Sequence, residues 1–228
     1  MRTLRGHEKT VSGVVFYAPS ALASSSRDGK VRLWDAETGR CARTLGGGEE
    51  WVRCVAASGD ARQLLAACGH DKVVRVWALG DESAGDAPLA ALAGHEHVVE
   101  AVAFAPALFR DALVDGAAPG DEAFVASAAR DATVRVWNVG TGECLAVLAE
   151  HAGWVRRVAF LGPAGKHLVS ASDDGAVKVW DLGPARRCVR TLEAAHGKAF
   201  VGALAVGVGG ALMATGGDDK VVRLWDLR

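Results

Sequence analysis

The sequence predicts an all-β fold built from five copies of one repeat, and three observations lead to this prediction. Five segments share a valine, a basic residue, an aliphatic residue and a tryptophan: Val31–Asp35, Val74–Ala78, Val134–Asn138, Val177–Asp181 and Val222–Asp226. Their tryptophans follow one another at intervals of 43, 60, 43 and 45 residues. An aspartate stands six residues before each of these tryptophans. Repeats of about 40–45 residues with short strands are typical of the four-stranded antiparallel blades of a β-propeller.

The repeats divide the chain into five predicted blades within a single domain, residues 1–228. Their approximate ranges are 5–45, 46–92, 93–148, 149–192 and 193–228, and the interval of 60 residues requires an insertion. Residues 106–121, which are rich in alanine, glycine, proline and aspartate, supply this insertion as a predicted surface loop.

The outer strand of a blade comes just before the next repeat, so Arg2–Leu4 is predicted to be such a strand. Two arrangements remain open. Either Arg2–Leu4 pairs beside Val222–Trp225 and closes a five-bladed ring, or the chain is an open part of a larger ring. In the second case we expect aggregation, because exposed strand edges can pair with other chains.

A set of polar residues recurs together with the aspartate and the tryptophan. Four repeats contain a histidine (His7, His95, His151 and His196) and, four residues before the aspartate, a hydroxyl (Ser24, Ser127, Ser170 and Thr215). This pattern resembles the WD-repeat family, and the resemblance covers essentially the whole chain. It implies a structural network of hydrogen bonds in the blades, because a buried carboxylate needs donors and a fully satisfied network is rigid. The members of this network would be His7, Asp28, Trp34, Asp71, Trp77, His95, Asp131, Trp137, His151, Asp174, Trp180, His196, Asp219 and Trp225.

The second repeat has Gly48 at the histidine position and Ala67 at the hydroxyl position. Both partners are missing together, so we expect this blade to be the least rigid.

The recurrence of the Ser–His–Asp set also argues against a hydrolase, which would have one catalytic triad, and no Gly-x-Ser-x-Gly elbow is present. Gly46–Gly48 lacks the Lys and Ser/Thr of a phosphate-binding loop. We therefore expect neither enzymatic activity nor a cofactor.

Composition and charge exclude further classes of protein. The net charge is −1, whereas a nucleic-acid-binding protein needs a basic excess to displace counterions from phosphates. The N-terminus has no apolar stretch of a signal peptide. Ala199–Gly217 carries no charge over 19 residues, but six of them are glycines. We expect two strands joined by a turn at Gly207–Gly210, and no membrane helix.

The five cysteines include no Cys-x-x-Cys pair, and Cys41, Cys144 and Cys188 stand at similar points of their repeats. This pattern predicts small buried hydrophobic residues in a reducing cytosol, with neither a disulfide framework nor a zinc site.

Local segments narrow the resemblance within the WD-repeat family. They are Glu50–Arg53, Gly153–Arg156, His95–Glu100 followed by Phe104–Pro106, the arginines in Ser26–Asp28 and Ala129–Asp131, and a chain that stops just after Trp225. In order and spacing they are similar to the last five blades of the lissencephaly-type nuclear distribution proteins, which regulate cytoplasmic dynein.

The resemblance implies a protein-binding regulator in microtubule-based transport, nuclear migration and mitosis, located in the cytoplasm on the cytoskeleton. Its partner would be the dynein motor domain. Other dynein cofactors are further implied partners, as are acetylhydrolase catalytic subunits, because the family also provides the non-catalytic subunit of platelet-activating-factor acetylhydrolase. The alternative is a general WD-repeat scaffold or substrate-receptor subunit unrelated to dynein. The family's N-terminal LisH motif, coiled coil and two further blades do not match any segment here. This departure predicts a fragment, and it puts dimerisation of the family's kind in doubt.

The candidate partner-binding residues lie in loops that open on one face of a propeller. They are Arg27 and Arg130 before the aspartate, with Trp51, Arg53, Trp154 and Arg156 after the histidine position. The resemblance implies dynein contacts at the positions of Arg27, Arg53, Arg130 and Trp154, and the loss of a further basic contact at Gly175. Arginine and tryptophan are enriched in binding hot spots, and guanidinium groups suit an acidic partner. The alternatives are solvated loop charges or caps over the aspartates for the arginines, and packing between blades for the tryptophans.

Overall fold

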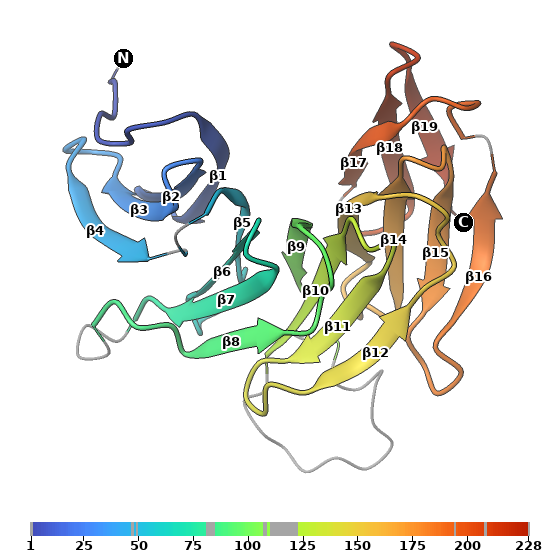
Figure 1. Ribbon diagram of the computed structural model, residues 1–228, viewed down its shortest axis with the longest axis horizontal. Coiled ribbons are helices and arrows are strands. Elements are labelled where there is room, and N and C mark those ends of the chain that lie inside the picture. Colours follow the sequence, from blue (N-terminus) through green and yellow to red (C-terminus); the bar gives the residue numbers. More distant parts are fainter. Residues whose placement is uncertain are drawn as a thin grey trace. The chain divides into compact units, whose positions relative to one another are not determined.

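The computed structural model (Figure 1) describes residues 2–46, 48, 50–80, 85–106, 109, 123–193, 195–207 and 209–227. These residues form β-strands and turns, and none of them lies in an α-helix. The strands make five antiparallel sheets of three or four strands, as in the blades of a WD-repeat β-propeller. They are divided between two compact units, Met1–Val102 and Ala103–Arg228, and each unit is described by itself. The assignment of 1–228 to a single domain stays a prediction.

The first unit contains two four-stranded sheets in which chain neighbours pair. The first sheet consists of β1 (Val11–Ala18), β2 (Ala21–Ser26), β3 (Lys30–Asp35) and β4 (Cys41–Gly46). The second consists of β5 (Val52–Ala57), β6 (Leu64–Gly69), β7 (Val73–Ala78) and β8 (Ala90–Ala93). The boundary between the units falls within β9 (Val99–Phe104).

The remaining strands form three more sheets with the same order. In the third sheet β9 is followed by β10 (Phe124–Ala129), β11 (Val134–Asn138) and β12 (Cys144–Leu148). The fourth consists of β13 (Val155–Leu161), β14 (His167–Ser172), β15 (Val177–Asp181) and β16 (Arg187–Leu192). The fifth has three strands in the described part of the chain: β17 (Val201–Val206), β18 (Leu212–Gly217) and β19 (Val222–Asp226).

Apolar residues that alternate along the strands build the core inside each unit. In the first unit, Val31 and Leu33 of β3 belong to one buried cluster with Val52 and Val55 of β5, so the first sheet packs on the second. In the second unit, Val177 of β15 packs in the same way with residues of the fifth sheet, which include Val201 and Met213. Removing this apolar surface from water is the main stabilising term of the fold.

The same irregularity recurs in the first strand of four sheets. The register with the second strand shifts between Val11 and Gly13, between Val52 and Cys54, between Val155 and Arg157, and between Val201 and Ala203. A bulge leaves one extra residue out of the ladder and turns its side chain in a new direction. The extra residues in β5 and β13 are Arg53 and Arg156, both of them candidate binding residues.

Arg2–Leu4 is not a strand, so the prediction of an outer strand there is wrong. A strand satisfies its backbone groups through a neighbour, and the first sheet consists of β1 to β4 without these residues. The described part of the fifth sheet ends at β19, whose Val222 and Leu224 are exposed. By contrast, the predicted hairpin at Gly207–Gly210 is confirmed, because β17 and β18 pair on either side of it.

The prediction for the cysteines of the outer strands is also wrong. Cys144 is exposed, and Cys41 and Cys188 are half-buried. These residues begin β12, β4 and β16, the outermost strands of their sheets, which have a neighbouring strand on one side only. Each thiol donates to the carbonyl oxygen two residues further on, at 3.4 Å.

The predicted insertion, residues 106–121, lies mostly outside the described residues. Within it Phe109 is fully buried, so the prediction of a surface loop does not hold at this position. Its ring packs edge-on against Phe124 and Phe160, with centroid distances of 5.4 and 5.1 Å. In the part of the chain that the structure covers, no helix has the length and apolar character to cross a membrane.

Candidate partner-binding site

Buried polar side chains fix the loops of the first sheet. His7 Nδ1 lies 2.8 Å from Asp28 Oδ2, and His7 Nε2 lies 2.7 Å from Ser24 Oγ. Trp34 Nε1 donates to Ser24 Oγ at 2.8 Å. An ionised carboxylate only accepts hydrogen bonds, so Nδ1 of His7 donates to Asp28, and Nε2 shares a hydrogen bond with the Ser24 hydroxyl. This hydrogen-bonded chain joins the segment before β1 to β2 and β3.

The same chain recurs in the second unit. His151 contacts Asp174 at 2.7 Å and Ser170 at 2.8 Å, and Trp180 Nε1 donates to Ser170 Oγ at 2.8 Å. His196, Asp219, Thr215 and Trp225 repeat the arrangement with distances of 2.8 Å. In the third sheet Trp137 Nε1 donates to Ser127 Oγ at 2.8 Å. The hydroxyl groups are buried and accept from an indole, so this set of residues holds strands together and does not present a nucleophile.

The aspartates of this chain also anchor the turns between the second and third strands of their sheets, and the Asp28 turn carries Arg27. Asp28 Oδ1 accepts from the Lys30 amide at 3.0 Å and Oδ2 accepts from the Glu8 amide at 3.0 Å. Burial alone would raise the pKa of Asp174, but hydrogen bonds from His151 and from the amides of Ala176 and Ala152 outweigh it and lower the pKa to about 2. The pKa of Asp28 is also lowered, because hydrogen bonds from His7 and from the amides of Glu8 and Lys30 outweigh the effect of burial. The turns are thus held by ionised carboxylates.

The second repeat replaces the missing partners with other groups. The Arg75 guanidinium forms an ion pair with Asp71, and Trp77 Nε1 donates to the Asp86 carbonyl oxygen at 3.2 Å. Gly48, at the histidine position, has a φ of 117°, and a Cβ there would lie 2.5 Å from Asp71 Oδ2. Arg223 forms the equivalent ion pair with Asp219 in the fifth sheet, where His196 also contacts this aspartate. The lower rigidity of this blade stays a prediction.

Arginine side chains stack on tryptophan rings at two equivalent places. In the first unit the Arg27 guanidinium carbon lies 3.9 Å from the ring centroid of Trp51. In the second unit that of Arg130 lies 4.2 Å from the centroid of Trp154. Each arginine comes from the turn between the second and third strands of one sheet, and each tryptophan directly precedes the first strand of the next sheet. Attraction between a cation and the face of an indole stabilises both stacks.

The two arginines in the bulges are ion-paired with acidic side chains. Arg53 donates to Glu100 Oε2 through Nε at 3.1 Å and through a terminal nitrogen at 2.6 Å, and the Glu100 side chain is buried. Arg156 pairs with both carboxylate oxygens of Asp173, at 2.8 and 2.7 Å, and its guanidinium carbon lies 4.9 Å from the Trp154 centroid. The charges of Arg53 and Arg156 are therefore compensated inside the protein, and Arg156 also lies against the ring of Trp154.

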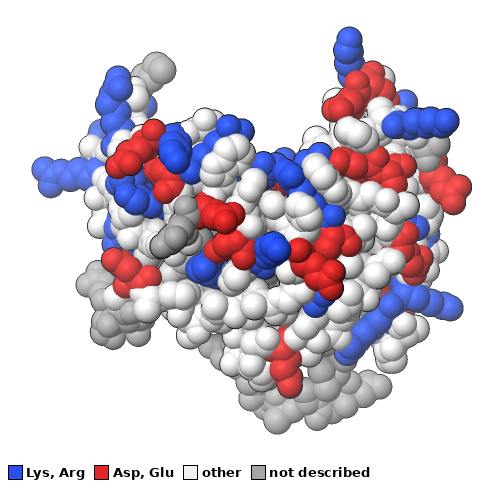
Figure 2. Space-filling model, in the orientation of Figure 1, with Lys and Arg blue, Asp and Glu red and all other residues white. Residues whose placement is uncertain are grey.

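We name these groups the first Arg–Trp cluster (Arg27, Trp51 and Arg53) and the second Arg–Trp cluster (Arg130, Trp154 and Arg156). Arg27 is exposed, and in the described part of the chain it has no ion pair. Trp154 is 39% exposed, which is unusual for so large an aromatic ring. Figure 2 shows that Lys and Arg are interspersed with Asp and Glu over the visible face.

Of the six candidate residues, the structure brings Arg27 onto Trp51 and brings Arg130 and Arg156 onto Trp154, whereas Arg53 contacts Glu100. Sequence reasoning missed Glu100, Asp173 and His70, whose ring lies 4.8 Å from that of Trp51. His70 and Asp173 occupy the position of Arg27 in their own repeats, and an alignment of the repeats would have placed them at this face. Gly175, where a basic contact was expected to be lost, has a φ of 81°, and a Cβ there would meet the Gly197 carbonyl oxygen at 2.8 Å. Lys72 and Lys220 occupy the equivalent positions of their repeats at a φ of 67°, so the close approach of the Gly197 carbonyl oxygen is what distinguishes Gly175.

Comparison with known families agrees with the repeated geometry. The family model described as "WD domain, G-beta repeat" matches residues 1–35, 39–78, 114–138, 142–181 and 186–226. The chain belongs to the WD-repeat family.

Within this family the chain is similar to named nuclear distribution proteins of fungi. It is 41% identical over 211 residues to nuclear distribution protein PAC1-2 of Uncinocarpus reesii, covering 86% of this chain and 45% of the relative. It is 38% identical over 206 residues to nuclear distribution protein nudF of Emericella nidulans, with 86% and 45% covered. Nuclear distribution protein nudF 1 of Talaromyces marneffei is 41% identical over 207 residues, with 87% and 44% covered. The chain thus spans about half the length of these relatives.

Proposed function

We propose that this WD-repeat protein is a non-catalytic regulator that binds the motor domain of cytoplasmic dynein through its two Arg–Trp clusters. It would act in the cytoplasm on microtubule-associated motors, in nuclear migration, transport and cell division. The similarity to nuclear distribution proteins supports this role. The observation that carries the proposal is the repetition of one Arg-on-Trp stack at equivalent loops of two sheets.

The geometry of the clusters suits an acidic protein surface. In the first cluster the indole covers one face of the exposed Arg27 guanidinium and leaves its edge donors for carboxylates. The exposed part of Trp154 adds apolar area beside Arg130. Arginine and tryptophan together are the side chains that contribute most to protein interfaces. Arg53 and Arg156 are paired with Glu100 and Asp173 and are therefore expected to contribute less to binding directly.

The test measures binding of the full chain to an immobilised dynein motor domain by interferometry, at low and at physiological salt. The variant carries Arg27→Glu and Arg130→Glu, and it leaves Arg53 unchanged because a carboxylate there would face the buried Glu100. We expect the variant to bind at least about tenfold more weakly, since each charge removed from a hot spot costs more than about 1 kcal/mol. Wild-type binding should also weaken as salt rises.

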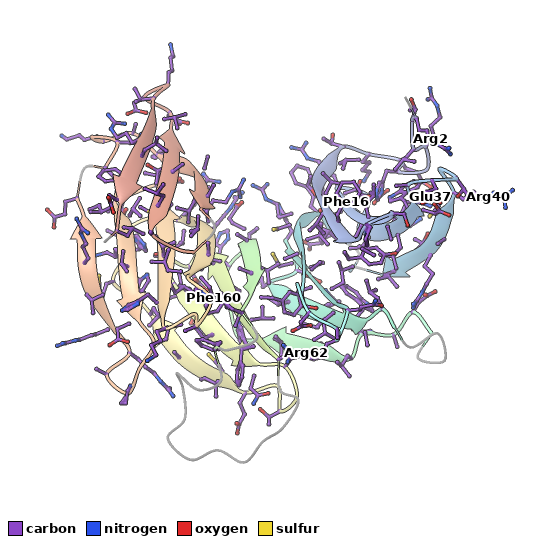
Figure 3. The ribbon with its side chains drawn as sticks, turned by 180° about the vertical axis from the view of Figure 1, so that it is seen from behind. Arg2, Phe16, Glu37, Arg40, Arg62 and Phe160 are labelled. Atoms are coloured by element: carbon purple, nitrogen blue, oxygen red, sulfur yellow. The ribbon has the colours of Figure 1, made fainter. Side chains whose placement is uncertain are left out.

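A matched control carries Arg40→Glu and Lys166→Glu, which change the net charge equally. Both side chains are exposed, and Arg40 projects outward from the turn after β3 (Figure 3). Both residues lie in turns at the opposite end of their strands from the clusters. The control should bind within about twofold of the wild type. Equal loss in both variants, or no binding by a chain with an intact circular dichroism spectrum, would instead favour a general WD-repeat scaffold with another partner.

A further inference from the structure

Two cysteines face each other across the first two strands of the second sheet. Cys54 of β5 is the register partner of Cys68 of β6, directly after the bulge of β5. Cys54 is half-buried and Cys68 is buried, and all five cysteines of the chain are reduced. We propose that Cys54 and Cys68 form a redox-active dithiol, a modification site at which a low-molecular-weight disulfide such as glutathione disulfide creates a disulfide bond between β5 and β6.

The equivalent positions in other sheets show how close two side chains come at this point of the strand register. In the fifth sheet the equivalent pair is Ala203 and Gly216, and a Cβ on Gly216 would lie 3.3 Å from the Ala203 Cβ. In the first sheet the pair is Gly13 and Ser25, and a Cβ on Gly13 would lie 2.9 Å from Ser25 Oγ. Disulfides have Cβ···Cβ separations of about 3.5–4.5 Å. The 3.3 Å separation is slightly shorter than this range, so a bond at this register position requires the two strands to shift by a few tenths of an ångström.

The two thiols also differ in accessibility, which sets the order of the reaction. Burial, together with the adjacent Cys54 thiol, raises the pKa of the Cys68 thiol well above its usual range. Cys68 is therefore a poor first nucleophile, because the thiolate is the reactive form. Cys54 is the thiol that solvent and small molecules reach.

The reaction proceeds by two successive thiol–disulfide exchanges. The Cys54 thiolate attacks one sulfur of glutathione disulfide, the S–S bond breaks, and one glutathione leaves as a thiolate that takes up a proton. The Cys68 sulfur, after losing its proton, attacks the Cys54 sulfur of the mixed disulfide and expels the second glutathione. Two protein thiols are oxidised and one glutathione disulfide is reduced to two glutathione molecules. The second step should accelerate as pH rises, since it needs the Cys68 thiolate.

The bond would lie in the sheet that lacks the histidine and the hydroxyl of the other repeats. In this sheet Ala67 stands beside Cys68 at the hydroxyl position, so no polar chain passes through β6 there. A covalent link between β5 and β6 would restrict the unfolded chain and stabilise this sheet. It would also restrict the movement of β5, which begins directly after Trp51 and contains Arg53.

The test exposes the full chain to glutathione buffers of increasing oxidised fraction and identifies the bonds by peptide mapping. Trypsin cleaves after Arg53, Arg62 and Lys72, so Cys54 and Cys68 fall in separate peptides, 54–62 and 63–72. We expect these two peptides to become linked and the count of titratable thiols to fall from five to three. The thermal midpoint of the oxidised chain should be higher than that of the reduced chain.

Two variants separate this dithiol from ordinary surface oxidation. Cys54→Ser should abolish the link and leave Cys68 reduced, and its thermal midpoint should not respond to oxidised glutathione. Cys144→Ser removes the exposed cysteine and should leave the link between 54–62 and 63–72 unchanged. The proposal fails if Cys144 is glutathionylated while these peptides stay separate, if Cys54 stops at the mixed disulfide, or if the link forms only in denatured protein.

Discussion

At the scale of single residues, the buried aspartates have the clearest energetic role. Asp174 receives hydrogen bonds from His151 and from two backbone amides, so its charged form is favoured over the protonated form. Its pKa in the folded chain is about 2, against 3.8 for an ordinary aspartate. A carboxylate whose pKa is lowered on folding stabilises the protein above the unfolded pKa. It loses this contribution as the pH falls through the folded pKa.

The first prediction concerns this pH dependence. Asp174→Asn should lower the free energy of unfolding by roughly 1–2 kcal/mol at neutral pH, after allowance for solvent screening. Below about pH 4 the difference between wild type and variant should shrink, and it should vanish near about pH 2. Urea denaturation across this range, followed by circular dichroism, measures it. A constant difference between the two chains at all pH values would show that the charge of Asp174 contributes nothing.

The polar chain could be predicted at this scale because its members stand at constant spacings in the repeats. The ion pair of Arg53 with Glu100 could not, since the two residues lie 47 positions apart and only folding brings them together. The exposure of Cys144 depends on its place in an outermost strand, which composition does not reveal.

At the scale of a single element, the second sheet shows how one repeat keeps the fold with different side chains. Asp71 keeps its role, but its donor is Arg75, which comes from a strand of the same sheet. Gly48 has a φ of 117°, a backbone conformation suited to glycine, and a Cβ there would lie 3.4 Å from an Arg75 guanidinium nitrogen. A substitution at Gly48 alone is therefore not expected to restore the pattern of the other repeats.

The second prediction tests this adjustment. Gly48→His, which restores the residue type of the other repeats, should destabilise the chain by more than about 1 kcal/mol. The reasons are the positive φ of Gly48 and the 2.5 Å approach of its Cβ to Asp71. The measurement is the urea midpoint, with Gly59→His as control, because no atom lies within 4 Å of a Cβ at that exposed position. A more stable Gly48→His chain would mean that the loop can adopt the conformation of the other repeats.

At the scale of the whole molecule, equivalent residues differ in exposure according to their sheet. Leu33 of β3 is 3% exposed because the second sheet covers it, whereas Leu224, at the same position of β19, is 79% exposed. Phe16 of β1 and Phe160 of β13, both labelled in Figure 3, are also equivalent. Phe16 is 63% exposed, while Phe160 packs against Phe109. Apolar surface of this kind favours association with other chains.

The third prediction compares two equivalent substitutions. Leu224→Glu should change the free energy of unfolding by less than about 0.5 kcal/mol and should reduce self-association, because the side chain is already in solvent. Leu33→Glu buries a charge in the core of the first unit and should cost several kcal/mol. Urea denaturation measures the first quantity, and sedimentation velocity over a concentration series measures the second. Similar destabilisation by both substitutions would show that Leu224 is covered in solution.

The number and order of the sheets could be predicted from the sequence, because the spacing of the tryptophans follows directly from the length of a blade. Whether Arg2–Leu4 forms a strand could not be predicted in this way. A short segment becomes a strand only where the edge of a sheet forms hydrogen bonds with it. The candidate binding residues were found from their positions in the repeats. Which of their charges are compensated depends on long-range contacts with Glu100 and Asp173.

The stacking of Arg27 on Trp51 and of Arg130 on Trp154 has a consequence for the kinetics of recognition. A free arginine side chain samples many rotamers and loses this freedom when a partner immobilises it, at a cost of about 0.5–1.5 kcal/mol for each side chain. Here the indole rings already hold the guanidinium groups in place before any partner arrives. Much of this conformational entropy is therefore lost when the chain folds. Less of the interaction energy is then needed to offset the entropy loss when a partner binds. The complex should accordingly dissociate more slowly than one made by arginines on unsupported loops.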